Sequence, residues 1–127
     1  INMPISPKYS IFVCRVINGK TPDDAIKRLE DVVKMKRVIP MHSLEVPHKK
    51  GKGIAGARYP KTVCIEIIKL IQQVKANAAV VGIENPVITI ARADKSQGPY
   101  KRGGARAKRA HVYIEVMDKS KLVRKKK

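Results

Sequence analysis

One helix-forming segment, residues 59–82, constrains the fold of this chain more than any other feature. Pro60 suits the beginning of a helix, and Gly82 suits its end. Between them, apolar side chains recur at helical spacing, and such a stripe is typical of a helix that faces a core. The stripe comprises Val63, Ile67, Leu70, Ile71, Val74 and Ala78, and Ile65 and Ile68 widen it. We therefore expect a long central helix in an aliphatic core, because Trp is absent and aromatic residues make up only 4% of the chain.

Residues 21–37 predict a second helix. Thr21 is a good cap, Pro22 suits the first turn, and Asp23 and Asp24 meet the positive end of the helix dipole. Four of the chain's ten acidic residues lie in this segment. We therefore expect its outer face to meet water rather than a polyanion.

The segment 5–20 gives conflicting signals. Ser6 and Pro7 suit a helix start and Gly19 a helix end, whereas the run Ile11-Phe12-Val13 has strand propensity. The capping residues favour a helix.

Two strands are predicted near the end of the chain, at residues 85–94 and 110–118. In the first, Ile88 and Ile90 alternate with Val87 and Thr89. The second alternates in the same way, with Val112, Ile114 and Val116 set against Tyr113 and Glu115. The fold class that follows is α+β, with three helices packed on one face of a small antiparallel sheet.

The expected organisation is one domain over residues 1–127. A long basic β-hairpin, with its extended connection at 91–111, projects from it, and a basic tail occupies 119–127. Residues 40–61 lack periodicity, so we expect a loop there.

Positive charge dominates the chain, with 28 Lys plus Arg against 10 Asp plus Glu, a formal net charge of +18. Such an excess favours a polyanionic partner. Residues 46–65 and 95–114 contain no acid, whereas a surface shaped only for solubility mixes both signs. Blocks of one sign indicate phosphate contacts, and loops that carry them suit a folded RNA better than regular DNA.

The predicted RNA contacts fall into three blocks. The first is His48, Lys49, Lys50, Lys52, Arg58 and Lys61; the second is Arg92, Lys95, Lys101, Arg102, Arg106, Lys108 and Arg109; the third is the tail, represented by Lys125. Tyr100 joins the second block, where it either stacks on an exposed base or packs against its own hairpin. The residues alone leave both interpretations open.

Catalysis, metal binding and membrane insertion find little support. His42, His48 and His111 are scattered, and no zinc-protease, P-loop or dinucleotide motif is present. Cys14 and Cys64 lie in apolar runs and are predicted to be small buried hydrophobes in a reducing compartment. No apolar run approaches the ~18 residues of a membrane span. We predict no cofactor, no metal and no membrane partner.

Several stretches resemble a universal ribosomal protein family of the large subunit, numbered twenty-two in bacteria and seventeen in eukaryotes. The resemblance lies in INGKTPDDAIKRLEDV (17–32), in ARYPKTVCIEIIKLIQQVKANA (57–78), and in two strands around a basic hairpin. The segment SPKYSIFVCRVINGK (6–20) is similar to that family's first helix. Residues 46–57 resemble an insertion of archaeal and eukaryotic members.

The resemblance implies a structural role without catalysis, in the large subunit of cytoplasmic ribosomes. It implies ribosomal RNA and neighbouring ribosomal proteins as partners, with the body near the polypeptide exit. It also implies that the hairpin, residues 95–109, reaches towards the exit tunnel and the nascent polypeptide. The connection GPYKRGGARAKRAH (98–111) is shorter than in typical eukaryotic members, so its reach stays open. The alternative is a free-standing RNA-binding regulator.

Overall fold

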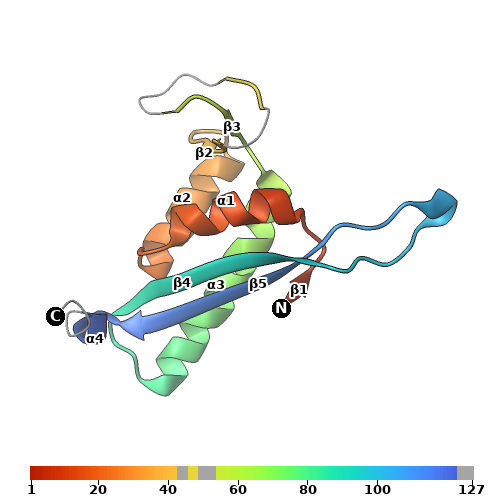
Figure 1. Ribbon diagram of the computed structural model, residues 1–127. Helices are drawn as coiled ribbons and strands as arrows, with labels where there is room; N and C mark the ends of the chain where they lie inside the picture. Colours follow the sequence, from red (N-terminus) through yellow and green to blue (C-terminus); the bar gives the residue numbers. More distant parts are fainter. Residues whose placement is uncertain (43–45, 49–53, 123–127) are drawn as a thin grey trace.

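The computed structural model describes residues 1–42, 46–48 and 54–122. The chain forms three long helices and a narrow sheet, from which a hairpin extends far to one side (Figure 1). The elements are β1 (Asn2–Met3), α1 (Pro7–Ile17), α2 (Pro22–Val33), β2 (Ile39–Pro40), β3 (Ala57–Arg58), α3 (Lys61–Val81), β4 (Pro86–Ser96), a 3₁₀ turn (Arg102–Gly104), β5 (Arg109–Asp118) and α4 (Lys119–Leu122).

The main sheet is antiparallel and has the strand order β1-β5-β4. One face is buried against the helices, with Ala93 of β4 paired with Val112 of β5. The opposite face is exposed, and Tyr113 keeps 53% of its surface there. The predicted α+β class, with three helices, a small antiparallel sheet and a β-hairpin, is thus confirmed, and residues 5–20 do form a helix.

A β-bulge corrects the predicted alternation in β4. The register shifts between Ile88 and Ile90, so Thr89 is an extra residue without an opposite partner. One inserted residue turns every later side chain to the other face of the sheet. Ile88 is therefore fully buried, whereas Ile90, predicted on the same face, is 45% exposed.

The turn after α1 holds this bulge in place. The backbone N–H of Gly19 donates to the Ile88 carbonyl and the Ile88 N–H donates to the Lys20 carbonyl, both at 2.9 Å. Asn18 Oδ1 accepts from the Ala91 N–H at 2.6 Å, just beyond the bulge. Gly19 has a φ of +77°, a backbone conformation that is unfavourable for residues other than glycine. The turn and the bulge therefore form one interlocked unit.

Helix α3 supplies the centre of the core, largely as its apolar stripe predicts. Val63, Ile67, Leu70, Ile71 and Ala78 are buried. Cys64 joins them, because it shares the inward face with residues three and seven positions later. Val74 and Ile68 are half-buried. The predicted widening at Ile65 is wrong: this side chain is 42% exposed, since it lies about 200° around the helix from Val63.

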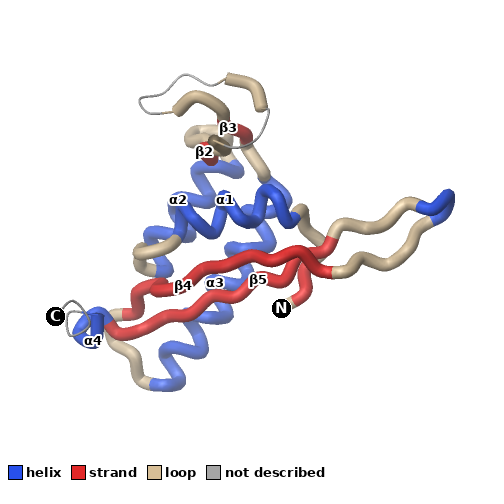
Figure 2. The backbone as a smooth tube through the Cα atoms, in the orientation of Figure 1, coloured by secondary structure: helices blue, strands red, loops and turns tan. Residues whose placement is uncertain are grey.

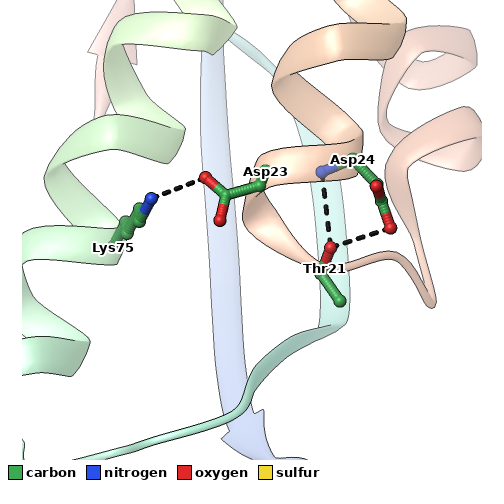
Figure 3. Close-up of polar contacts among 4 residues, drawn as sticks. All are labelled: Thr21, Asp23, Asp24 and Lys75. Carbon is green, nitrogen blue, oxygen red and sulfur yellow. Dashed lines mark hydrogen bonds and ion pairs between the residues drawn. The ribbon is translucent and has the colours of Figure 1, made fainter.

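Helix α2 begins as predicted and is tied to α3. Thr21 Oγ1 accepts from the Asp24 backbone N–H at 3.3 Å and donates to the Asp24 carboxylate at 2.9 Å. Figure 3 shows these contacts beside an ion pair between Asp23 and Lys75 of α3, at 2.5 Å. The helix ends at Val33, before the predicted limit of residue 37.

The segment expected to be a loop, residues 40–61, contains short structure. Ile39 pairs with Arg58 and Pro40 with Ala57, which forms a small antiparallel sheet that local patterns did not predict. Because these strands have only two residues each, their side-chain alternation is too brief to give a sequence signal.

Candidate nucleic-acid interface

The hairpin consists of a paired base and a thinner outer part. Strands β4 and β5 pair as far as Ser96 and Arg109. Beyond them, the Ala107 N–H donates to the Pro99 carbonyl at 3.0 Å, and the Lys101 N–H donates to the Ala105 carbonyl at 2.6 Å. Figures 1 and 2 show this outer part extending clear of all three long helices. The tip therefore has no protein core to pack against.

Gly98 lets the two arms of the hairpin approach closely. A Cβ added at this position would lie 1.7 Å from the Ala107 carbonyl oxygen, so no side chain fits without a backbone shift. The requirement is steric closeness rather than unusual dihedral angles. At the tip, by contrast, Gly103 and Gly104 have φ values of +74° and +77° and form the tight turn.

The cations of the second block line this hairpin and remain largely unneutralised. Arg92 forms an ion pair with Asp94 at 3.0 Å. Within the described ranges, no acid pairs with the other cations of that block, which are Lys95, Lys101, Arg102, Arg106, Lys108 and Arg109. All are exposed except Arg109, which is half-buried. Their mutual repulsion is therefore left for an external anion to relieve.

Tyr100 contacts its own hairpin. The Arg106 guanidinium lies over the ring, 4.2 Å from its centroid, and Arg106 Nη2 donates to the Tyr100 hydroxyl. The ring nevertheless keeps 70% of its surface exposed. The contact predicted by the packing interpretation is present, and base stacking stays a prediction.

The first residue of α1, Pro7, lies next to the base of the hairpin, which the sequence did not indicate. A hollow of ≈210 Å³ lies there, with Pro7 at one side and hairpin residues around the rest. The hairpin residues are Lys95, Ser96, Gln97, Gly98, Arg106, Ala107, Lys108 and Arg109. The link between Pro7 and the hairpin depends on folding, so local sequence patterns carry no signal for it.

The first block lies elsewhere on the molecule. His48 Nδ1 is 3.0 Å from the Ala55 carbonyl oxygen, Arg58 Nη1 donates to the Tyr9 hydroxyl at 3.2 Å, and Lys61 begins α3. All three are exposed. Lys49, Lys50 and Lys52 lie outside the described residues, as does Lys125 of the tail. Figure 1 shows β3 and the hairpin tip on different sides of the body. The β3 segment, which carries Arg58 of the first block, is thus separated from the tip cations of the second block.

Both cysteines are buried, and the described residues form no cluster suited to a metal ion. Cys14 and Cys64 are free and buried, and burial raises the pKa of each thiol to about 12. Over residues 1–42, 46–48 and 54–122, no group of three His, Cys, Asp or Glu side chains is placed to hold a metal. Within those same ranges, no helix is both long and apolar enough to cross a bilayer.

The fold and the surface together define a class, an α+β protein whose cationic hairpin lies outside its hydrophobic core. The family model described as Ribosomal protein L22p/L17e matches residues 1–122, and the chain belongs to that family. This confirms the resemblance noted above.

Curated relatives come from archaea. The large ribosomal subunit protein uL22 of Archaeoglobus fulgidus is 44% identical over 101 residues, covering 75% of this chain and 64% of the relative. That of Methanocaldococcus jannaschii is 39% identical over 100 residues, covering 76% and 64%. That of Methanoculleus marisnigri is 37% identical over 127 residues, covering 91% and 82%. The chain thus spans 64% of the length of the first two relatives and is of archaeal type.

Proposed function

We propose that this chain is a structural, non-catalytic constituent of the large subunit of cytoplasmic ribosomes, which binds ribosomal RNA. The family match and the names of the archaeal relatives support this assignment. One observation carries the RNA contact: a hairpin outside the core, with a row of cations of which Arg92 alone pairs with a described acid.

Electrostatics favour the binding of RNA phosphates by the hairpin cations. Each Lys or Arg that contacts a phosphate releases condensed counterions, which stabilises the complex and makes it sensitive to salt. Arginines also bind phosphate oxygens through two donors at once. Buried in RNA, the hairpin cations would lose their mutual repulsion. We propose further that the body lies near the polypeptide exit beside neighbouring ribosomal proteins, with the hairpin directed towards the tunnel and the nascent polypeptide.

Sedimentation of the tagged chain from a lysate of the cells that make it tests the proposal. We expect co-migration with the large subunit that survives a high-salt wash, because contacts buried in assembled RNA exchange slowly. Release into the soluble pool at modest salt would instead support the free-standing RNA-binding regulator.

A further inference from the structure

A second group of cations gathers at the end of α2, far along the chain from the hairpin. A hollow of ≈430 Å³ lies between this helix end and the segment around β3. Its lining comprises Arg28, Lys36, Arg37, Val38, Ile54 and Tyr59. The blocks of charge recognised in the sequence include none of the three cations.

Arg28 is the most informative of these residues. Its Nη2 donates to the Val38 carbonyl at 2.9 Å, whereas its Nη1 is buried and has no hydrogen-bond partner in the described part of the chain. Buried N–H groups of a cation are normally satisfied, and each exception calls for an explanation. Burial lowers the pKa of Arg28, and the charge of Arg37 lowers it further. The nearby charge of Asp31 raises this pKa and offsets the two effects only in part, so the positive charge of Arg28 is incompletely compensated.

The backbone places the other two cations beside it. Met35 has a φ of +60°, a left-handed conformation that is uncommon for a residue other than glycine. After it, the N–H groups of Lys36 and Arg37 both donate to the Asp31 carbonyl, at 2.8 and 3.3 Å. Arg37 Nε also lies 3.5 Å from the Asp31 carboxylate. Of the three cations in the lining, Arg37 is thus the one that the described ion pairs join to a carboxylate.

A purely structural explanation covers only part of this arrangement. Cations after the last turn of a helix interact favourably with its negative end, which accounts for Lys36 and Arg37. It does not account for Arg28, which lies within the helix and buries an unpartnered N–H. The two ends of helix α2 thus carry opposite charge: Asp23 and Asp24 lie in its first turn, and the cationic hollow lies at its other end.

We propose that this hollow binds a backbone phosphate of RNA, as a contact separate from the hairpin; the proposal rests on the RNA-binding function proposed above. A phosphate in the hollow would supply negative charge beside Arg28 and relieve the repulsion between Arg28 and Arg37. RNA is favoured over a free anion because Lys36 and Arg37 of the lining are exposed at the surface, and so is Arg58, which precedes Tyr59 of the lining in the sequence. The RNA backbone would then contact both the hollow and Arg58 at this end of the body.

The test compares paired charge changes on the whole chain. The variant Lys36→Gln/Arg37→Gln removes two cations of the hollow, both exposed, so it should fold. The control Lys27→Gln/Lys34→Gln removes the same charge from exposed positions of α2 and its cap that do not line the hollow. Arg28→Gln is a third variant, used only if its circular dichroism matches that of the original chain.

The probe is purified archaeal large-subunit RNA, with binding measured over a series of KCl concentrations. We expect the hollow variant to bind several-fold more weakly than the control. The slope of log K against log salt should fall by about one for each phosphate that the variant no longer neutralises. Equal reductions in affinity for the hollow variant and the control would overturn the proposal.

Three further outcomes can be distinguished. If inorganic phosphate raises the melting temperature of the original chain but not of the hollow variant, while RNA slopes stay equal, the hollow takes a free anion and the RNA contact is wrong. If the original chain and all variants fail to bind RNA, the proposed function itself fails. If the hairpin variant Lys101→Gln/Arg102→Gln/Arg106→Gln loses affinity while the hollow variant binds as its control does, the function stands and this inference falls.

Discussion

Strands β4 and β5 lead from the helix-covered body into the hairpin, but the two regions differ: buried apolar side chains stabilise the body, whereas the hairpin consists largely of exposed residues. In the body, β4 and β5 bury Ile88, Ala93 and Val112 against helices. In the outer hairpin, residues 97–108 present exposed cations and a few backbone hydrogen bonds. The comparison teaches that stability and binding are separated along one pair of strands. Substitutions in each region should therefore affect one property and spare the other.

The largest effect on stability is expected at the centre of the core. Ile71 of α3 is fully buried, so Ile71→Ala should lower the free energy of unfolding by about 2–5 kcal/mol, because it removes buried apolar surface and leaves a cavity. Urea denaturation measures it. Ile65→Ala on the same helix, at a position 42% exposed, is the matched control and should change stability by less than ~0.5 kcal/mol. Equal effects would contradict the assignment of the core face.

A smaller effect is expected at the turn that locks the bulge. Asn18→Ala removes the acceptor for the Ala91 N–H and should cost about 1–3 kcal/mol. Asn77→Ala, at an exposed position of α3, serves as the control. Thermal melts of both variants give the difference. If Asn18→Ala melts like the control, the turn does not hold the bulge.

Because the thiols of Cys14 and Cys64 are buried, we expect the free energy of unfolding to fall at alkaline pH. Both pKa values rise from 9.0 to about 12 on folding, so the unfolded chain loses its protons first. Stability from this source is complete below pH 9 and declines as the pH rises from about 9 to 12, by roughly 1 kcal/mol per thiol at about pH 9.5. Melts of the original chain and of Cys14→Ala/Cys64→Ala, compared between pH 8 and 9.5, measure it. Parallel declines would show that the thiols do not contribute.

The smallest effect on stability belongs to the hairpin. Gly98→Ala forces the Ala107 carbonyl away and should open the outer hairpin, yet change the free energy of unfolding by less than about 0.5 kcal/mol. Amide hydrogen exchange should rise at Lys101 and Ala107 and stay slow in β5 at Val112. Ala105→Ser, at the exposed tip, is the control. Global destabilisation by Gly98→Ala would show that the hairpin is part of the core.

The sequence predicted those features that local signals determine. Caps, prolines and apolar periodicity gave the three helices, and alternation gave β5. The bulge at Thr89 escaped prediction because its cause is distant: Asn18 and Gly19 hold β4 from another part of the chain. Local patterns carry no such pairing.

The sequence predicted which cations belong to the candidate site but not how they are arranged on the folded body. Runs of Lys and Arg identified the hairpin cations, whereas nothing in the sequence showed that β3, with Arg58, lies on a different side of the body from the hairpin tip. The hollow at Arg28 was not predicted, for a related reason. Its cations are close in space only because Met35 turns the chain back after α2.

The measurement that tests the central claim most directly pairs RNA affinity with stability in one hairpin variant. Lys101→Gln/Arg102→Gln/Arg106→Gln is compared with Lys27→Gln/Lys34→Gln/Lys69→Gln, which removes the same charge from exposed positions on and next to the body helices α2 and α3. We expect the hairpin variant to keep its melting temperature, to bind large-subunit RNA at least ~10-fold more weakly than the control, and to lose about three units of salt slope. A lower melting temperature with unchanged RNA affinity would contradict the account.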